Sequence, residues 1–243
     1  MFPILQLGPL AIQVPGLFML AGVWIGIMVT ERTAARFNLS PDLLNSLVFY
    51  ALIAGVVGAR LAYVLRYFET YLGNPLSVLA LNPYTLSPSE GLLAGVLAAW
   101  VFGQRKGLKL WRTLDALTPG LAVFMVAVAL AHVSSGDAFG SPTGVPWAIE
   151  LWGAARHPSQ VYELVGAAII LGLVIRLRSH PLPAGMYTLM FVSLTSAARL
   201  LLEGFRGDSA LIFGGVRQAQ IISLAILLAA LIGIRMRSVK SQR

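Results

Sequence analysis

Six polar side chains crowd the first turns of one strongly apolar segment. The segment reads RHPSQVYELV over residues 156–165 and continues as GAAIILGLVI. Pro158, at the first helical turn, fixes the angle at which the chain enters a helix. So many polar groups exceed what a helix cap requires, and the pattern therefore predicts the lip of a polar cavity. The residues assigned to this lip, which include a carboxylate from the preceding loop, are His157, Gln160, Tyr162, Glu163 and Asp137.

A second polar cluster lies in the stretch ARLLLEGFRGD. Arg199, Glu203 and Arg206 stand at i, i+4 and i+7, on one face of a predicted helix. One interpretation is a structural ladder of ion pairs. The other is that Glu203 orients two guanidinium groups that grip an anion such as phosphate, because a guanidinium can bind a phosphate through two parallel hydrogen bonds. The pattern alone leaves both interpretations open.

Arg60 lies within the apolar stretch AGVVGARLAYVLR, six residues before Arg66. At 1.5 Å per helical residue, this spacing places Arg60 roughly 9 Å deeper than Arg66. A long side chain at this depth can extend toward the lipid headgroups. Alternatively, its guanidinium faces a cavity and binds an anion.

Two further side chains could exchange protons. Glu90 follows Ser87-Pro88-Ser89, which fits a capping box in which a serine and a glutamate exchange hydrogen bonds with each other's backbone. A catalytic carboxylate is the alternative for Glu90. His132 could form an acid–base pair with Asp137, or it could have a structural role near a membrane surface.

The composition predicts an integral membrane protein. Of the 243 residues, 57% are hydrophobic and 12% are charged, against about a quarter charged in a soluble domain. The mean hydropathy is +0.78. No cysteine is present, which excludes a disulfide, a thiolate metal site and a covalent thiol intermediate on this chain. We expect one polytopic membrane domain over residues 1–243, with neither metal nor cofactor, and any reacting thiol must arrive with a substrate.

Seven segments are long and apolar enough to cross a hydrocarbon core of ~30 Å. The expected fold is therefore an all-α bundle of seven transmembrane helices. Helix-start chemistry at Ser40-Pro41-Asp42 and the stretch SHPLPAG at 179–185 mark two of the breaks. The predicted spans lie near residues 14–30, 43–65, 89–104, 114–134, 159–177, 184–205 and 216–235.

The positive charges predict the orientation. Twelve of the eighteen Lys and Arg residues fall at one set of helix ends, against four at the opposite ends and two within spans. The positive-inside rule places the richer set in the cytoplasm, with the N-terminus outside and the C-terminus inside. The net charge of +8 therefore indicates an anionic membrane surface and not nucleic acid as the partner. The cytoplasmic set is Arg32, Arg36, Arg105, Lys106, Lys109, Arg112, Arg176, Arg178, Arg235, Arg237, Lys240 and Arg243.

Several of these motifs together resemble the bacterial prolipoprotein diacylglyceryl transferase family. RHPSQVYEL resembles its H-P-S-Q-L-Y-E signature, and ARLLLEGFR matches its R-x-x-x-E-x-F-R. GARLAYVLRY, SGDAFGSPTGVPWAIE and QAQIIS resemble further family motifs in the same order, and Asp115 with Pro119 fits its D-x-x-x-P. The resemblance covers nearly the whole chain.

The resemblance implies an enzyme of the bacterial cytoplasmic membrane. Such an enzyme transfers the diacylglyceryl group of phosphatidylglycerol to the lipobox cysteine thiol of a prolipoprotein. The partners would be phosphatidylglycerol, the prolipoprotein and the lipid bilayer. The resemblance assigns phosphate binding to Arg60 and Arg199, with Glu203 orienting them and Arg206 in support. It also makes Arg199 a candidate catalytic residue.

Four positions depart from the family pattern. The family histidine that begins span three is Glu90 here, and a family arginine at the end of span four is Ala129. The Tyr-Gly of span one is Pro15-Gly16, and a tyrosine one turn before the span-six arginine is Thr195. In an active enzyme, Glu90 or His132 would take over proton removal. The alternatives are a catalytically impaired paralogue that binds lipid or precursor, and a small-solute transporter.

Overall fold

The structure is a computed structural model and describes residues 4–8, 10–80, 85–212 and 214–241. Arg243, one of the predicted cytoplasmic cations, lies outside the described residues. The chain forms two compact units, one of Met1–Thr33 with Leu114–Arg243 and one of Ala34–Thr113. Each unit is described by itself.

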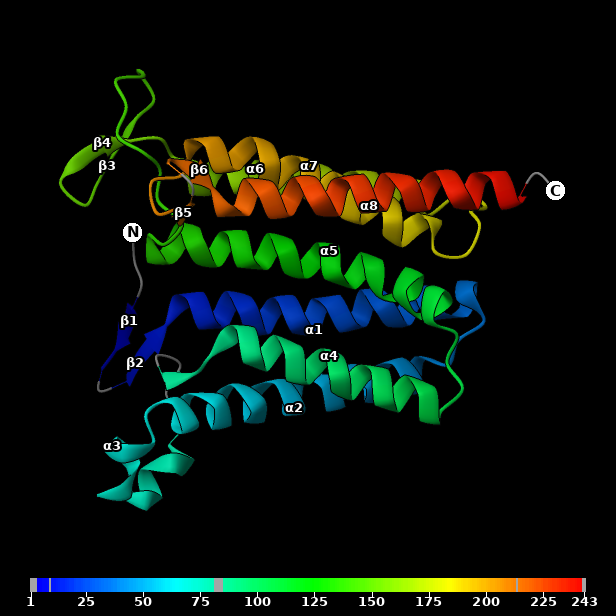
Figure 1. The fold of residues 1–243 in the computed structure, drawn as a ribbon, viewed down its shortest axis with the longest axis horizontal. Coiled ribbons are helices and arrows are strands. Elements are labelled where there is room, and N and C mark those ends of the chain that lie inside the picture. Colours follow the sequence, from blue (N-terminus) through cyan, green and yellow to red (C-terminus); the bar gives the residue numbers. More distant parts are fainter. Residues whose placement is uncertain (1–3, 9, 81–84, 213, 242–243) are drawn as a thin grey trace. The chain divides into compact units, whose positions relative to one another are not determined.

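Long helices form the larger unit and run alongside one another (Figure 1). They are α1 (Val14–Ala34), α5 (Leu110–Ser135), α6 (Ser159–Leu177), α7 (Met186–Leu202) and α8 (Gln218–Ser241). The helices α1 and α5 approach closely through glycine. A Cβ atom on Gly26 would lie 2.9 Å from the carbonyl oxygen of Gly120, so a larger residue here would push the helices apart.

In the described residues, three short antiparallel hairpins accompany the helices of this unit, and the sequence patterns did not predict them. Their strands are β1 (Ile4–Leu7) with β2 (Leu10–Gln13), β3 (Ile149–Leu151) with β4 (Ala154–Arg156), and β5 (Leu211–Ile212) with β6 (Val216–Arg217). The last two hairpins lie in the loops before α6 and before α8. The predicted helical architecture therefore holds for the bulk of the described residues, while the loops contain strand pairs.

The smaller unit consists of α2 (Pro41–Arg66) packed along α4 (Pro88–Arg105). Small residues allow this packing, since a Cβ atom on Gly91 would lie 2.7 Å from the carbonyl oxygen of Gly55. Between them lie the short helix α3 (Phe68–Leu72) and a 3-10 helix over Pro75–Leu79. These short elements lie between the second and third predicted spans, where no membrane-crossing helix is expected.

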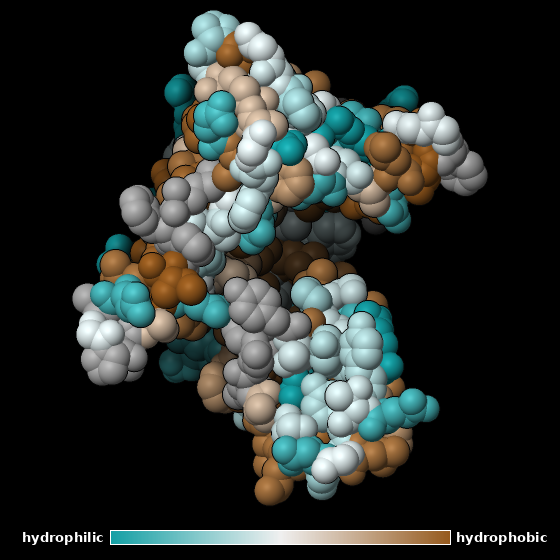
Figure 2. Space-filling view, turned by 90° about the vertical axis from the view of Figure 1, so that its left-hand side faces the viewer, coloured by the Kyte–Doolittle hydropathy of each residue, from teal (hydrophilic) through white to brown (hydrophobic). Residues whose placement is uncertain are grey.

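Within the described residues, six helical segments are long and apolar enough to cross a membrane. They correspond to six of the seven predicted spans, and α4 is not among them. Large apolar side chains are exposed on these helices, as expected for a surface solvated by lipid, and brown apolar areas are visible in Figure 2. The chain is therefore a multi-pass helical membrane protein. The six segments are Val14–Phe37, Pro41–Arg66, Leu110–Ser135, Ser159–Leu177, Met186–Phe205 and Gln218–Val239.

A buried carboxylate of α5 holds the start of α7. One oxygen of Asp115 accepts the Gly185 backbone N–H at 2.5 Å, and the other accepts the Thr188 N–H at 2.9 Å and the Thr188 hydroxyl at 2.7 Å. Asp115 thus caps α7 from a neighbouring helix, satisfying N–H groups that have no partner within α7. This contact fixes the helix that carries Arg199 near its other end.

We expect Asp115→Asn to lower the free energy of unfolding by about 1.5–3 kcal/mol, the value of a hydrogen bond to a charged group. The amide nitrogen would face the Gly185 N–H, so one donor would lose its acceptor. Thermal unfolding of the detergent-solubilised protein measures the loss. The control is Asp42→Asn, because Asp42 is exposed at the start of α2. Equal stability of the two variants would contradict the capping role.

Candidate functional site

The loop that precedes α6 is joined to the segment that follows α7. Residue Ser141 donates its N–H to the Phe205 carbonyl at 2.8 Å, and Gly207 donates to the Phe139 carbonyl at 2.8 Å. Ser141 also contacts the start of α6, because its carbonyl accepts the His157 N–H at 3.1 Å. These backbone hydrogen bonds fix the start of α6 relative to the end of α7.

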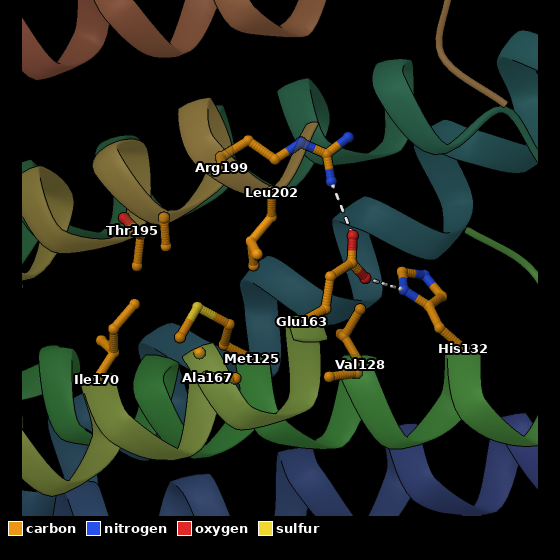
Figure 3. Close-up of a pocket in the computed structure, with 12 residues that line it drawn as sticks. Met125, Val128, His132, Glu163, Ala167, Ile170, Thr195, Arg199 and Leu202 are labelled. Atoms are coloured by element: carbon orange, nitrogen blue, oxygen red, sulfur yellow. Dashed lines mark hydrogen bonds and ion pairs between the residues drawn. The ribbon is translucent and has the colours of Figure 1, made fainter. Parts of the chain in front are cut away.

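Glu163, in the second turn of α6, joins three cationic or titratable side chains. One carboxylate oxygen lies 2.6 Å from Arg206 and 3.3 Å from Arg199. The other lies 3.0 Å from Nδ1 of His132, which comes from α5. Only 13% of the Glu163 side chain is exposed. In Figure 3, His132 and Arg199 approach this carboxylate from different helices.

The predicted Arg–Glu–Arg ladder is present, although the helix does not continue through it. The α7 helix ends at Leu202, and a 3-10 turn over Glu203–Phe205 leads to Arg206. Glu203 lies 2.9 Å from Nε of Arg199 but 4.0 Å from Arg206. Arg206 is therefore held chiefly by Glu163 and by Asp208, at 2.7 Å.

Arg206 is firmly cationic. Burial alone would lower the pKa of its guanidinium, but the hydrogen bond to Asp208 and the charges of Glu163 and Asp208 outweigh burial, so this pKa lies above its usual value. Arg199 differs in its accessibility, since 42% of its side chain is exposed. Two carboxylates orient Arg199 while part of its guanidinium remains available to a ligand.

A cavity of about 270 Å³ lies between α5, α6 and α7, directly beside this network. Its polar lining residues include His132, Glu163 and Arg199. The rest of its lining is mainly apolar, with Met125 and Ile170 among the side chains in Figure 3. Ala129 also lines the cavity. The cavity thus combines an apolar body with a cationic and titratable group at one side.

The other residues assigned to the cavity lip have different surroundings. Gln160 is fully buried, and its side-chain nitrogen lies 3.5 Å from the Gly136 carbonyl. Tyr162 accepts a hydrogen bond from Trp147 at 2.7 Å, and His157 packs edge-on against Phe205. Asp137 is exposed in the loop. Among the five predicted lip residues, only Glu163 is part of the cavity lining described here.

Arg60, in the smaller unit, is buried among backbone carbonyl groups. Its guanidinium donates to the Ser77 carbonyl at 2.6 Å, the Val78 carbonyl at 2.9 Å and the Thr85 carbonyl at 2.9 Å. It also lies over the Tyr71 ring, 5.3 Å from the ring centroid. Arg60 therefore fastens the segment between α2 and α4, a role that the sequence did not indicate because its partners are 17 to 25 residues away.

The capping box predicted for Glu90 is wrong. The Ser87 side chain makes no cap hydrogen bond, and the Ser87 N–H donates to the Ala59 carbonyl at 3.0 Å instead of to Glu90. Glu90 forms an ion pair with Arg66 of α2, and the Ser89 hydroxyl donates to it at 2.6 Å. Tertiary contact between α2 and α4 outweighs the local motif, since Arg66 offers the carboxylate a full opposite charge.

The helix α8 and the strand β6 that leads into it contact both ends of α7. Arg217 donates to the Glu203 carbonyl, and the Gln220 side chain donates to the Leu200 carbonyl at 3.3 Å. Near the other end of α8, Arg237 donates to the Ala184 carbonyl. Carbonyls at a helix C-terminus have no partner within the helix, so Arg217 and Gln220 complete the end of α7 that carries the site.

Comparison with known proteins gives consistent matches. A family model of prolipoprotein diacylglyceryl transferase matches residues 3–236. Three similar proteins are each named phosphatidylglycerol–prolipoprotein diacylglyceryl transferase. The protein of Finegoldia magna is 31% identical over 89% of this chain and 88% of its own length. That of Synechococcus elongatus is 28% identical over 95% and 85%, and that of Gloeobacter violaceus is 29% identical over 95% and 90%.

Proposed function

This chain belongs to the prolipoprotein diacylglyceryl transferase family, and on that premise we propose that it transfers the diacylglyceryl group of phosphatidylglycerol to the lipobox cysteine thiol of a prolipoprotein. The product is a thioether, and glycerol phosphate leaves. The cysteine belongs to the substrate, in agreement with the absence of cysteine from this chain.

The observation that carries the proposal is the pairing of an apolar cavity with an oriented, partly accessible guanidinium. A phospholipid combines an apolar body with a phosphate ester, which matches a cavity lined by apolar side chains with Arg199 at one side. A preoriented cation stabilises the charge that grows on the leaving phosphate. Arg199 is the proposed phosphate ligand, Glu203 and Glu163 orient it, and Arg206 supports Glu163.

We propose that Arg60 contributes to lipid binding through the segment to which it is hydrogen-bonded. Its hydrogen bonds to three carbonyl groups order residues 77–85 where they are described. We propose that this ordering shapes the part of the smaller unit that receives lipid or precursor. Its effect on transfer would then be indirect, unlike that of Arg199.

We further propose seven spans, with α4 as the span added to the six, the N-terminus outside and the C-terminus in the cytoplasm of a bacterial inner membrane. At 1.5 Å per residue, the 18 residues of α4 extend about 27 Å, close to the thickness of a hydrocarbon core. The positive charges then lie mainly on the cytoplasmic side.

Cysteine labelling tests this topology, because the chain contains no cysteine of its own. We expect a membrane-impermeant maleimide to label Glu150→Cys in intact spheroplasts. Lys109→Cys should be labelled only after permeabilisation. Labelling of Lys109→Cys in intact spheroplasts would contradict the proposed orientation.

Complementation tests the activity. Expression of this chain in bacteria depleted of their own transferase is expected to restore growth and lipoprotein maturation. If the protein accumulates in the membrane and binds phosphatidylglycerol but does not restore growth, it is a binding paralogue. This second candidate rests on the resemblance described above, in which Ala129 stands where the family has an arginine.

A further inference from the structure

The transfer reaction requires a base, because a thiol with a pKa near 8.5 is largely protonated at neutral pH. Resting on the proposed function, we infer that His132 is this base and that Glu163 positions it. Glu90, the other candidate for this role, forms an ion pair with Arg66 in the smaller unit.

The carboxylates of the site are already in contact with cationic, imidazole or hydroxyl side chains. Glu163 is held by Arg199 and Arg206 on one oxygen and by His132 on the other. Glu203 accepts the Ser209 hydroxyl at 2.6 Å on one oxygen, and its other oxygen forms an ion pair with Nε of Arg199 at 2.9 Å without hydrogen-bond geometry. These carboxylates are acceptors of existing hydrogen bonds and ion pairs, so they are poorly placed to take a proton from a thiol.

Asp208 and His157 are also poorly placed to act as the base. Both oxygens of Asp208 accept hydrogen bonds from Arg206, at 2.9 and 2.7 Å. His157 lies 3.4 Å from the Tyr162 hydroxyl through Nδ1, and it is not part of the described cavity lining. His132 lines the cavity itself. Among the described groups, it therefore combines access to the substrate with a basic nitrogen.

The contact with Glu163 selects the tautomer of His132. Two guanidinium groups keep Glu163 a carboxylate, which accepts hydrogen bonds and does not donate them. Nδ1 of His132, at 3.0 Å from that carboxylate, must then carry the hydrogen. The lone pair is left on Nε2, for which the described part of the chain shows no hydrogen-bond partner. Serine hydrolases use this logic, in which a carboxylate orients an imidazole and stabilises its protonated form.

The step balances without any further reactant. The thiol hydrogen moves to Nε2 of His132, and the thiolate sulfur attacks the glyceryl carbon that bears the phosphate ester. A carbon–sulfur bond forms while the carbon–oxygen bond breaks, and the electron pair of the broken bond leaves on the glycerol phosphate. Arg199 neutralises that departing charge, and the imidazolium then returns its proton to the product phosphate or to water.

A pair of peptide substrates tests the assignment. A lipobox peptide with selenocysteine in place of cysteine presents a nucleophile that is already ionised at neutral pH and needs no base. With vesicles of phosphatidylglycerol as donor, we expect His132→Ala to lower kcat for the cysteine peptide by about 10²–10⁴-fold, the usual contribution of general base catalysis. Transfer to the selenocysteine peptide should stay within about tenfold of the wild-type rate. The matched control is His180→Ala, a histidine of the loop between α6 and α7, which should leave both rates unchanged.

His132→Gln with added imidazole provides a second measurement, in which imidazole should restore transfer to the cysteine peptide. Equal losses on both peptides would assign a structural role to His132 and overturn the inference. An unchanged rate on the cysteine peptide, or a selective loss in Glu90→Gln instead, would overturn it as well. If the wild-type protein modifies neither peptide, the proposed function itself is wrong, and the base assignment falls with it.

Discussion

Arg199→Lys is expected to reduce diacylglyceryl transfer by about 10²–10³-fold, the loss that follows removal of one oriented group from a charge-stabilising site. Lysine keeps the positive charge but presents it as a point on a flexible stem. It cannot contact Glu163 and Glu203 together, as the two nitrogens of Arg199 do at 3.3 and 2.9 Å, and still face the cavity. The loss should therefore appear mainly in kcat.

The measurement is the rate of transfer to a lipobox peptide at saturating phosphatidylglycerol. Arg178→Lys is the matched control, because Arg178 lies at the opposite, predicted cytoplasmic end of α6. A wild-type rate for Arg199→Lys would contradict the role of the guanidinium shape. A rise in KM alone would limit Arg199 to ground-state binding.

Glu163→Gln should have an effect of similar size, about 10²–10³-fold on kcat, for a different reason. The amide keeps the shape of the side chain but removes the charge that holds Arg199, Arg206 and His132 together. The amide nitrogen of glutamine would face one of these donors, so the network would lose its common acceptor. Arg199, the proposed phosphate ligand, and His132, the proposed base, would then both lose their orientation.

Kinetics of single and double variants provide the measurement for Glu163. If Glu163 acts through His132, the double variant Glu163→Gln with His132→Ala should be hardly slower than the worse single variant, since coupled residues are non-additive. Glu150→Gln, an exposed glutamate of β3, is the control. Fully additive losses would contradict the coupling.

The helices could be predicted because hydrocarbon imposes a long apolar run on each span. Six predicted spans correspond to helical segments that are long and apolar enough to cross a membrane, and the seventh corresponds to α4. The helix-start motif Ser40-Pro41-Asp42 lies where α2 begins, at Pro41. The hairpins could not be predicted in the same way. Strands β3 and β4 are three residues each, too short for an alternating pattern, and their pairing depends on the turn at Trp152 and Gly153, both at positive φ.

The residues of the site could be predicted from the sequence, but most of the contacts between them could not. The spacing of Arg199 and Glu203 indicates their pairing, since a helix brings residues four apart together. Glu163 was assigned only to the cavity lip, because its partners are 31 to 43 residues away in sequence. The sequence did not indicate the partners of Arg60 and Glu90 for the same reason. Tertiary packing places backbone carbonyls around Arg60 and places Arg66 beside Glu90. A pattern within a single helix cannot indicate either contact.

Mass spectrometry of a lipobox peptide incubated with the purified protein and phosphatidylglycerol vesicles tests the central proposal most directly. We expect the cysteine peptide to gain the mass of one diacylglyceryl group, with an equal amount of glycerol phosphate released. A peptide with serine in place of the cysteine should remain unmodified. An unmodified cysteine peptide, in the presence of protein that binds the same vesicles, would contradict the proposal that this chain is an active transferase.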